Sequence, residues 1–186
     1  MLATAAFAAA AMSVPAQVTL ASPAPPYKVG DRIANFHLLS DKGRSISLAH
    51  YRGRVVVLAF YASWCPPCNT EAPKLEKQVW RAFRKDGVEV LGVAVEEADR
   101  GKLRPLAGFL RRHHLSYTLV SDARGKLLDR FGFEGIPELV VIDGAGLYRA
   151  NPPDVDAAVA TIRKLIAERA SRSGKRRAKA AARPHG

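Results

Sequence analysis

Two continuous apolar runs with a helix-like stretch between them constrain the fold of this chain more than any other feature. Residues 55–62 (VVVLAFYA) and 88–96 (VEVLGVAVE) are rich in β-branched side chains, as strands buried on both faces are. Between them, apolar residues recur at the spacing of one helix face, and these are Ala72, Leu75, Val79 and Phe83. A strand, a helix and a second buried strand predict a right-handed parallel crossover, which indicates an α/β protein.

Shorter patterns on both sides of the crossover complete the expected set of elements. In chain order these are a hairpin at 36–53, a helix at about 105–114, a strand at 117–122, a short helix at 126–132 and a hairpin at 138–150. A last helix begins after Asp154, a helix-capping residue, and carries an apolar stripe made of Val155, Val159, Ile162 and Ile166. We find no internal repeat among these elements.

Length and composition allow one domain with its own hydrophobic core. A chain of 186 residues with 48% hydrophobic side chains is too short for two comfortable domains. Two cysteines cannot build a disulfide scaffold, so the core has to supply the stability. The net charge of +12 is concentrated near the C-terminus, because residues 169–186 hold seven lysines or arginines and no acid.

Both ends of the chain differ in composition from the middle. Residues 1–21 are alanine-rich and uncharged, which predicts a secretory signal peptide cleaved after Ala16 or Ala21, although the usual basic start is absent. An uncleaved anchor or a disordered leader are the alternatives. Residues 22–28 form a proline-rich linker, 29–170 the domain, and 171–186 a basic tail that we expect to be disordered. No aromatic residue is interleaved with the charges of the tail, so we expect no specific nucleic-acid binding.

The two cysteines stand three positions apart in the segment SWCPPC, directly after the first apolar run. Cys65 is therefore expected at a helix N-terminus, where the helix dipole and free backbone N–H groups favour a thiolate. We expect its sulfur to point outward and attack, and Cys68 to face inward and resolve the mixed disulfide. Pro66 and Pro67 suit the first helical positions. Because prolines have no N–H, chiefly the amides of Cys68 and Asn69 are left to stabilise the Cys65 sulfur.

The order of strand, WCPPC, helix, strand and then GIP before a final hairpin and helix resembles the thioredoxin superfamily. More narrowly, it is similar to the TlpA/ResA-like branch of extracytoplasmic thiol–disulfide oxidoreductases. The resemblance runs from about residue 29 to 170 and includes WCPPCNTEAP and FGFEGIPELVVIDGAG. It implies a thioredoxin-like α/β fold with a central mixed sheet flanked by helices. An N-terminal β-hairpin and an inserted helix and strand (about 103–122), between the βαβ and ββα halves, complete that fold.

The resemblance also implies a substrate-docking surface around a redox-active disulfide between Cys65 and Cys68. In the superfamily, the proline at the position of Pro137 follows a cis peptide bond and lies against the cysteines. The backbone of Ile136 would then pair with a bound substrate strand. The docking residues expected on this basis are Trp64, Pro66, Pro67, Ile136 and Pro137.

Two glutamates are candidates for tuning the thiols. Thioredoxin carries a buried acid six positions before its first cysteine, but that position is Ala59 here. The resemblance assigns the acid role to Glu71, which could accept the Cys68 proton. The alternative is that Glu71 only complements the helix dipole. Glu138 stands where relatives usually have threonine, and could either raise the thiol pKa values or point to solvent.

Metal binding and peroxidase chemistry are the competing functions. Structural zinc needs four ligands, and His113 and His114, neighbours on a helix, have nothing to fix them near Cys65. The remaining candidates, His37 and His50, belong to the leading hairpin. Copper(I) suits thiolates, but copper-binding relatives typically separate their cysteines by three residues. Peroxiredoxins share the architecture, but their PxxxTxxC motif is absent here. We therefore expect no metal.

The sequence thus predicts a thiol–disulfide oxidoreductase in which Cys65 attacks, Cys68 resolves and Glu71 manages protons. No organic cofactor is required, because the two sulfurs carry both electrons. The resemblance implies a monomer in the periplasm or another extracytoplasmic compartment, with cysteine-containing protein substrates and a membrane thiol–disulfide electron donor. Most members of the branch are reductases, and cytochrome c maturation is their best-known task. No residue of this sequence names the substrate or the direction of electron flow.

Overall fold

A seven-stranded mixed sheet runs through the part of the chain that the computed structural model describes, residues 27–95, 104–122 and 124–181. The strands are β1 (His37–Ser40), β2 (Ser45–Ser47), β3 (Val55–Tyr61), β4 (Val88–Val95), β5 (Thr118–Asp122), β6 (Glu138–Ile142) and β7 (Tyr148–Ala150). The helical segments are η1 (Leu48–Tyr51), α1 (Pro66–Lys74), η2 (Leu75–Trp80), α2 (Arg81–Phe83), η3 (Arg84–Asp86), α3 (Arg104–Arg112), α4 (Lys126–Arg130) and α5 (Val155–Ala181). The expected leader and most of the linker lie outside the described residues.

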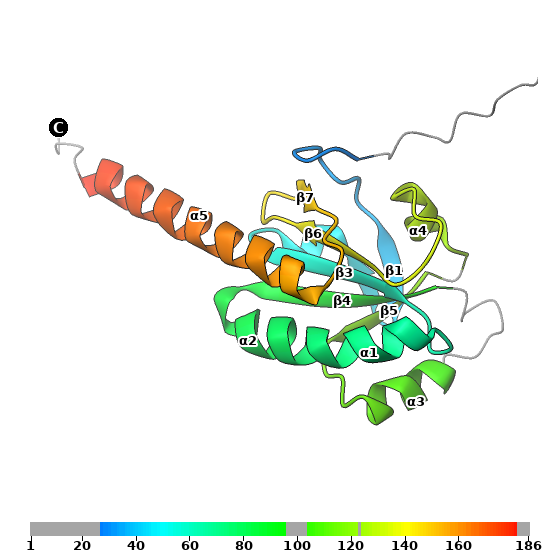
Figure 1. Ribbon diagram of the computed structural model, residues 1–186. Coiled ribbons are helices and arrows are strands. Elements are labelled where there is room, and N and C mark those ends of the chain that lie inside the picture. The colour runs from blue at the N-terminus through cyan, green and yellow to red at the C-terminus, as the bar shows by residue number, and fades with distance from the viewer. Residues whose placement is uncertain (1–26, 96–103, 123, 182–186) are drawn as a thin grey trace, which may run out of the picture.

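The strand order β2-β1-β5-β4-β3-β6-β7 confirms the predicted crossover and both hairpins (Figure 1). β3 and β4 are parallel, and β5 continues the parallel set on the far side of β4. β6 and β7 form one antiparallel edge, while β1 and β2 form the other. The sheet is therefore mixed, with the inserted β5 between β4 of the crossover and β1 of the leading hairpin.

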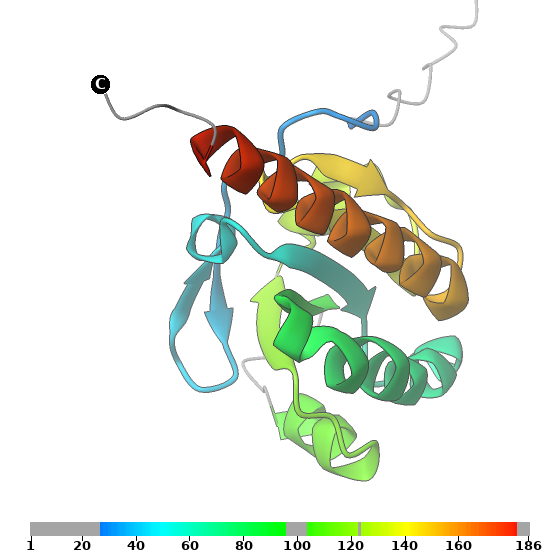
Figure 2. The same cartoon turned by 90° about the vertical axis from the view of Figure 1, so that its left-hand side faces the viewer.

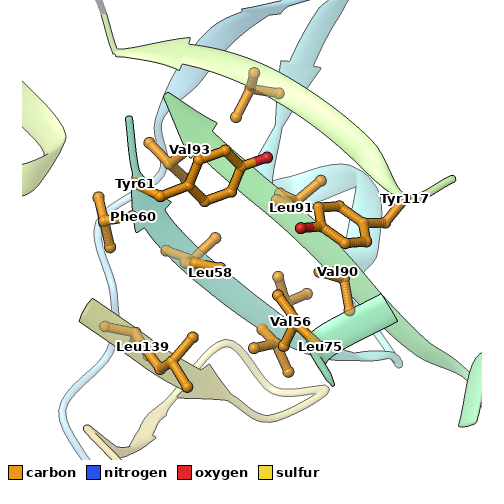
Figure 3. Close-up of a cluster of buried hydrophobic side chains, with 14 of the residues drawn as sticks. Val56, Leu58, Phe60, Tyr61, Leu75, Val90, Leu91, Val93, Tyr117 and Leu139 are labelled. Atoms are coloured by element: carbon orange, nitrogen blue, oxygen red, sulfur yellow. The ribbon is translucent and has the colours of Figure 1, made fainter. Parts of the chain in front are cut away.

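The core forms around β3 and β4, because every residue of these two strands is buried. The helix beginning with α1 and the start of α5 lie against the same face of the sheet (Figures 1 and 2). Figure 3 shows Leu58 and Leu91 of the sheet in one cluster with Leu75 of η2 and Leu139 of β6. A Cβ at Gly92 of β4 would come within 3.0 Å of neighbouring side chains, so packing this close requires glycine.

The helix that follows the cysteines is one continuous run with an irregular middle. It was expected as a regular helix, but η2 is π-helical, between α1 and α2. The wide turn begins at Leu75, two residues after Pro73 of α1. The π segment brings Glu76 to the interior, where its side chain is only 5% exposed.

Glu76 anchors the inserted segment to this helix. Its carboxylate accepts hydrogen bonds from the Ser116 amide (2.8 Å) and the Ser116 hydroxyl (2.6 Å), and forms an ion pair with Arg81 at 2.7 Å. Burial alone would raise the pKa of Glu76, but the hydrogen bonds from Ser116 and Arg81 outweigh it and hold that pKa below its ordinary value. The segment before β5 is thus tied to η2 by a buried charge.

The basic tail is helical in its described part, so the prediction of disorder for residues 171–181 was wrong. α5 continues to Ala181 and projects beyond the sheet in Figure 1. Alanine, lysine and arginine are strong helix formers, and the packed start of α5 supplies the costly nucleus. Within the extension, residues 171–175 and 178 are exposed, so helix propensity rather than packing accounts for this part.

In the described residues, no helix combines the length and the apolar character needed to cross a membrane. This includes α5, whose 27 residues carry a run of basic side chains.

Truncation after Ala170 should leave the melting temperature within about 3 °C of that of the full chain. The deletion removes the exposed side chains of residues 171–175 and 178 and the surface ion pair of Arg172 with Glu168, and such pairs contribute under about 1 kcal/mol. Truncation after Glu168 is the matched control and should cost more, because Arg169 donates to the carbonyls of Gly53 and Asp86. Thermal unfolding measures both, and a loss above about 6 °C for the first truncation would show that the tail packs on the domain.

Glu76→Gln should destabilise the protein by about 1–3 kcal/mol at pH 7, because one buried partner of Ser116 and Arg81 is weakened. Since the folded-state pKa of Glu76 is lowered, its stabilisation is present above the unfolded value of about 4.3 and is lost as the pH falls. Urea unfolding from pH 7 to pH 3 should therefore show the two proteins converging at acid pH. Asp41→Asn is the control on the exposed surface, and its free energy of unfolding should follow that of the parent at each pH. If Glu76→Gln lowers the free energy of unfolding by the same amount at every pH, the stabilising role assigned to the Glu76 charge is contradicted.

Candidate active site

The cysteine pair lies at the connection between β3 and α1. β3 ends at Tyr61, and Cys65 is the N-cap of α1 with an extended backbone (φ −85°, ψ 112°). Pro66 and Pro67 occupy the first two helical positions, as expected. Because α1 follows the carboxyl end of a buried parallel strand, the N-terminus of the helix is held in place by the core.

Cys65 and Cys68 form a disulfide, with their Cα atoms 5.3 Å apart. Cys65 is 3% exposed and Cys68 1% exposed. The expectation that the Cys65 sulfur points outward is therefore wrong for this oxidised form, since the bond turns the sulfur toward Cys68. Trp64, directly before the pair, is 60% exposed and remains the large apolar side chain on the surface beside the site.

One of the two expected backbone donors reaches the Cys65 sulfur. The Cys68 amide lies 3.3 Å from Cys65 Sγ and donates to it. The Asn69 amide instead donates to the Cys65 carbonyl at 3.2 Å, as the first regular bond of the helix. The sulfur thus receives the donor predicted at Cys68 but not the one predicted at Asn69.

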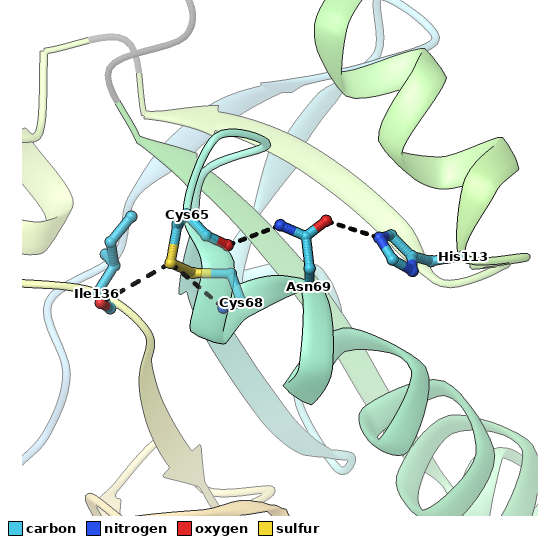
Figure 4. Close-up of a disulfide and its surroundings, with 5 residues drawn as sticks. All are labelled: Cys65, Cys68, Asn69, His113 and Ile136. Carbon is cyan, nitrogen blue, oxygen red and sulfur yellow. Dashed lines mark hydrogen bonds between the residues drawn. A yellow bond between two sulfur atoms is a disulfide. The ribbon is translucent and has the colours of Figure 1, made fainter.

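The GIP segment lies against the cysteines, and the Ile136–Pro137 bond is cis, as the resemblance implied. Cys65 Sγ is 3.9 Å from the Ile136 carbonyl oxygen (Figure 4). A disulfide sulfur carries no hydrogen, so this is a contact in the oxidised form, whereas a protonated thiol could donate there. The carbonyl of Ile136 therefore lies next to the sulfur that would be attacked.

Glu71 lies next to the inner cysteine. A small cavity of about 20 Å³ is lined by Cys68, Glu71 and Pro137, together with Ala59 and other apolar residues. Glu71 Oε1 pairs with Lys74 at 2.8 Å, whereas Glu71 Oε2 is buried and has no hydrogen-bond partner in the described part of the chain. The structure thus brings Glu71 into the same cavity as Ala59, the position at which thioredoxin carries its acid.

Glu138 is tied to the adjoining loop rather than left to solvent. Asn151 Nδ2 donates to Glu138 Oε2 at 2.9 Å and to the Leu139 carbonyl at 2.7 Å. Burial, and secondly the negative charge of Glu138, raise the pKa of Tyr148. The side chain of Glu138 is therefore engaged with Asn151 and acts electrostatically on Tyr148.

A link between the turn after the inserted α3 and the site was not predicted from the sequence. Asn69 Nδ2 donates to the Cys65 carbonyl at 2.8 Å, and Asn69 Oδ1 lies 2.8 Å from His113 Nε2. The expectation that nothing fixes His113 near Cys65 was wrong. No local pattern could reveal this contact, because it joins residues 44 positions apart whose types are ordinary.

Among the residues that the structure describes, no group of three or more histidine, cysteine or acidic side chains could hold a metal ion.

Comparison with known proteins places this geometry in a family. Residues 29–150 match the AhpC/TSA family. The thiol-disulfide oxidoreductase ResA of Halalkalibacterium halodurans is 31% identical over 119 residues, which cover 64% of this chain but only 65% of that relative.

Solved structures give the same picture. A thiol:disulfide interchange protein DsbE from Chlorobium tepidum is 25% identical with a TM-score of 0.63, covering 77% of this chain and 98% of that one. A secreted disulfide oxidoreductase of Mycobacterium tuberculosis, homologous to DsbE, is 27% identical with a TM-score of 0.59 over 70% of this chain and 96% of that one. The family match, the thioredoxin-like sheet and the CxxC pair at the start of α1 show that the chain belongs to the AhpC/TSA family of the thioredoxin superfamily.

Proposed function

We propose that this protein is a thiol–disulfide oxidoreductase of the ResA/DsbE type that exchanges two electrons with protein cysteines through Cys65 and Cys68. The observation that carries the proposal is the bonded pair at the N-terminus of α1, with the Cys68 amide donating to the Cys65 sulfur. A helix N-terminus lowers the free energy of a thiolate, the reactive form of cysteine. The names of its relatives support the same activity.

The reductase direction follows two exchange steps. In the reduced protein, the Cys65 thiolate attacks one sulfur of a substrate disulfide, forming a mixed disulfide and releasing the first substrate thiolate. Cys68 then loses its proton and attacks Cys65 Sγ, which releases the second substrate thiolate and leaves the Cys65–Cys68 disulfide. The substrate gains two electrons and two protons, and a dithiol donor has to reduce the protein again.

Substrate docking is assigned to the surface around the sulfur. Pro66 and Pro67 are exposed, and Trp64 stands 60% exposed next to them. The Ile136 carbonyl lies 3.9 Å from Cys65 Sγ, and we propose that the backbone of Ile136 pairs with an extended substrate segment. Pro137 lines the wall of the cavity behind the pair. These five residues make the docking surface that we propose.

Glu71 is proposed as the group that takes the Cys68 proton. Its Oε2 is buried and has no hydrogen-bond partner in the described structure, and Glu71 and Cys68 line the same cavity. A carboxylate that serves only the helix dipole would gain nothing from such burial, since an unsatisfied buried oxygen costs free energy. Proton exchange with Cys68 would account for a buried carboxylate oxygen at this position.

The cellular setting that we propose is extracytoplasmic, with a membrane thiol–disulfide donor and cysteine-containing protein substrates. The composition of residues 1–21 supports export, and one structural relative is described as secreted. An oxidising compartment favours disulfides, so a reductase there needs a continuous supply of electrons. Apocytochrome c is the substrate proposed on the ResA likeness, and the protein is proposed to act as a monomer.

Cys65→Ser should abolish disulfide exchange, whereas Cys68→Ser should accumulate mixed disulfides, because only the second variant keeps the attacking thiol. Insulin reduction measures the first effect, and non-reducing electrophoresis with mass spectrometry measures the second. A Cys65→Ser protein that reduces insulin at the parental rate would overturn the proposal. Peroxide consumption without insulin reduction would instead identify a thiol peroxidase, and stoichiometric copper(I) binding without turnover would identify a binding module.

Glu71→Gln should slow exchange and lower the thiol pKa of Cys68, because the amide neither accepts a proton nor repels a thiolate. The rate of alkylation by iodoacetamide, followed against pH for each cysteine by mass spectrometry, measures both thiols. A glutamate that only complements the dipole would cost about 0.3–1 kcal/mol of stability and leave the titration unchanged.

Glu134→Gln is the matched control for Glu71→Gln. It removes one negative charge from an exposed position close to the GIP segment, and we expect the parental titration and exchange rate. If both variants shift the titration equally, the effect comes from net charge and the role proposed for Glu71 fails.

A further inference from the structure

A chain of two side-chain hydrogen bonds connects the inserted segment to the backbone of the attacking cysteine. It runs from His113, directly after α3, through Asn69 of α1 to the carbonyl of Cys65. Figure 4 shows the three groups in line, with the Cys65 sulfur facing Cys68 and Ile136 on the other side. Both bonds are 2.8 Å long. The proposed exchange mechanism uses neither side chain.

The direction of each bond follows from the chemistry of the acceptor. A carbonyl oxygen can only accept, so the Asn69 amide nitrogen donates to Cys65 and the Asn69 amide oxygen faces His113. That oxygen also only accepts, so His113 Nε2 has to carry a hydrogen. Both donors therefore point toward Cys65, and their dipoles add along the chain.

The ring of His113 is held by the core. It packs edge-on against Phe109 with the ring centroids 4.7 Å apart, and Phe109 is fully buried and stacks on Tyr61 of β3. Burial, followed by the charges of Arg112 and His114, lowers the pKa of His113, which favours the uncharged ring. The packing against Phe109 holds the donor in position.

The two side-chain hydrogen bonds end at the carbonyl of Cys65, the residue that carries the attacking sulfur. It accepts two hydrogen bonds from Asn69, one from the backbone amide at 3.2 Å and one from the side chain at 2.8 Å. These bonds hold the N-cap conformation in which Cys65 Sγ faces the Cys68 amide. They also offset the negative end of a carbonyl dipole that belongs to the same residue as the thiolate.

We propose that His113 is a positioning residue for thiol–disulfide exchange, which acts through Asn69 to orient the Cys65 carbonyl and to favour the Cys65 thiolate. The inference deepens the proposed function and rests on it. It makes the turn directly after the inserted α3 a part of the active site that tunes the nucleophile, without contact with the reacting sulfurs.

The test uses the full chain, reduced with dithiothreitol, with His113→Leu and Asn69→Ala as the variants. Each should raise the thiol pKa of Cys65 by about half a unit, which is roughly a threefold smaller thiolate fraction near neutral pH. The alkylation rate of Cys65 against pH, read by peptide mass spectrometry, measures this shift. Because both residues act through one bond chain, the double variant should shift the pKa no further than Asn69→Ala alone.

Two further variants separate positioning from structure. His113→Gln keeps an N–H donor that can reach the Asn69 oxygen, so it should restore the parental titration. His114→Asn removes the adjacent exposed histidine from a left-handed backbone position that asparagine tolerates, and it should leave the titration unchanged. Thermal unfolding shows whether each variant is folded. If His113→Leu does not fold, the titration of Asn69→Ala tests the positioning role by itself.

The outcomes distinguish this inference from the proposed function. If folded Asn69→Ala and His113→Leu titrate as the parent does, while the parent reduces insulin, the positioning role fails and the oxidoreductase stands. If His113→Gln behaves like His113→Leu, the hydrogen bond is not the cause and the inference also fails. If the parent reduces no disulfide, the proposed function fails, and the Cys65 titration still decides whether the bond chain acts on the thiol.

Discussion

The structure depends above all on the turn that joins β3 to α1. β3 pairs with β4 on one side and β6 on the other, and it is buried throughout. Cys65 follows its carboxyl end as the N-cap of α1, while Ile136 precedes β6, whose register pairs Glu138 with Phe60 of β3. Strand pairing in the core therefore sets the distance between the Cys65 sulfur and the Ile136 carbonyl. The local loops only connect these two residues to the paired strands.

The inserted segment is attached to the long helix at two points with different consequences. Glu76 binds Ser116 through a buried carboxylate, so this attachment contributes to stability and responds to acid. Asn69, roughly two turns earlier, accepts a hydrogen bond from His113 and donates one to the Cys65 carbonyl. Because β5 also pairs in parallel with β4, the segment has a fixed place in the sheet, and its contacts with the helix are held at both points.

Local patterns in the sequence predicted the elements and the CxxC pair, since strand and helix periods and a motif are properties of neighbouring residues. The contacts of Glu76 and His113 could not be predicted, because each depends on a partner far along the chain. Glu76 also lies in a π-helical turn that no periodicity indicates. The basic tail shows the opposite error. Its lack of apolar residues predicted disorder, but helix propensity next to a packed helix was sufficient to extend α5 to Ala181.

The donors around Cys65 explain why hydrogen-bond geometry can control its reactivity. Pro66 and Pro67 remove two amides from the start of the helix, and in the described structure the Cys65 sulfur receives a backbone hydrogen bond from Cys68. When a thiolate is stabilised mainly by dipoles, its stability depends on their orientation, because an N–H dipole that points away from the sulfur no longer stabilises the negative charge. The N-cap conformation that aims the Cys68 amide is held by the bonds from Asn69 to the Cys65 carbonyl. Residues that fix this carbonyl can therefore change the chemistry of the sulfur without touching it.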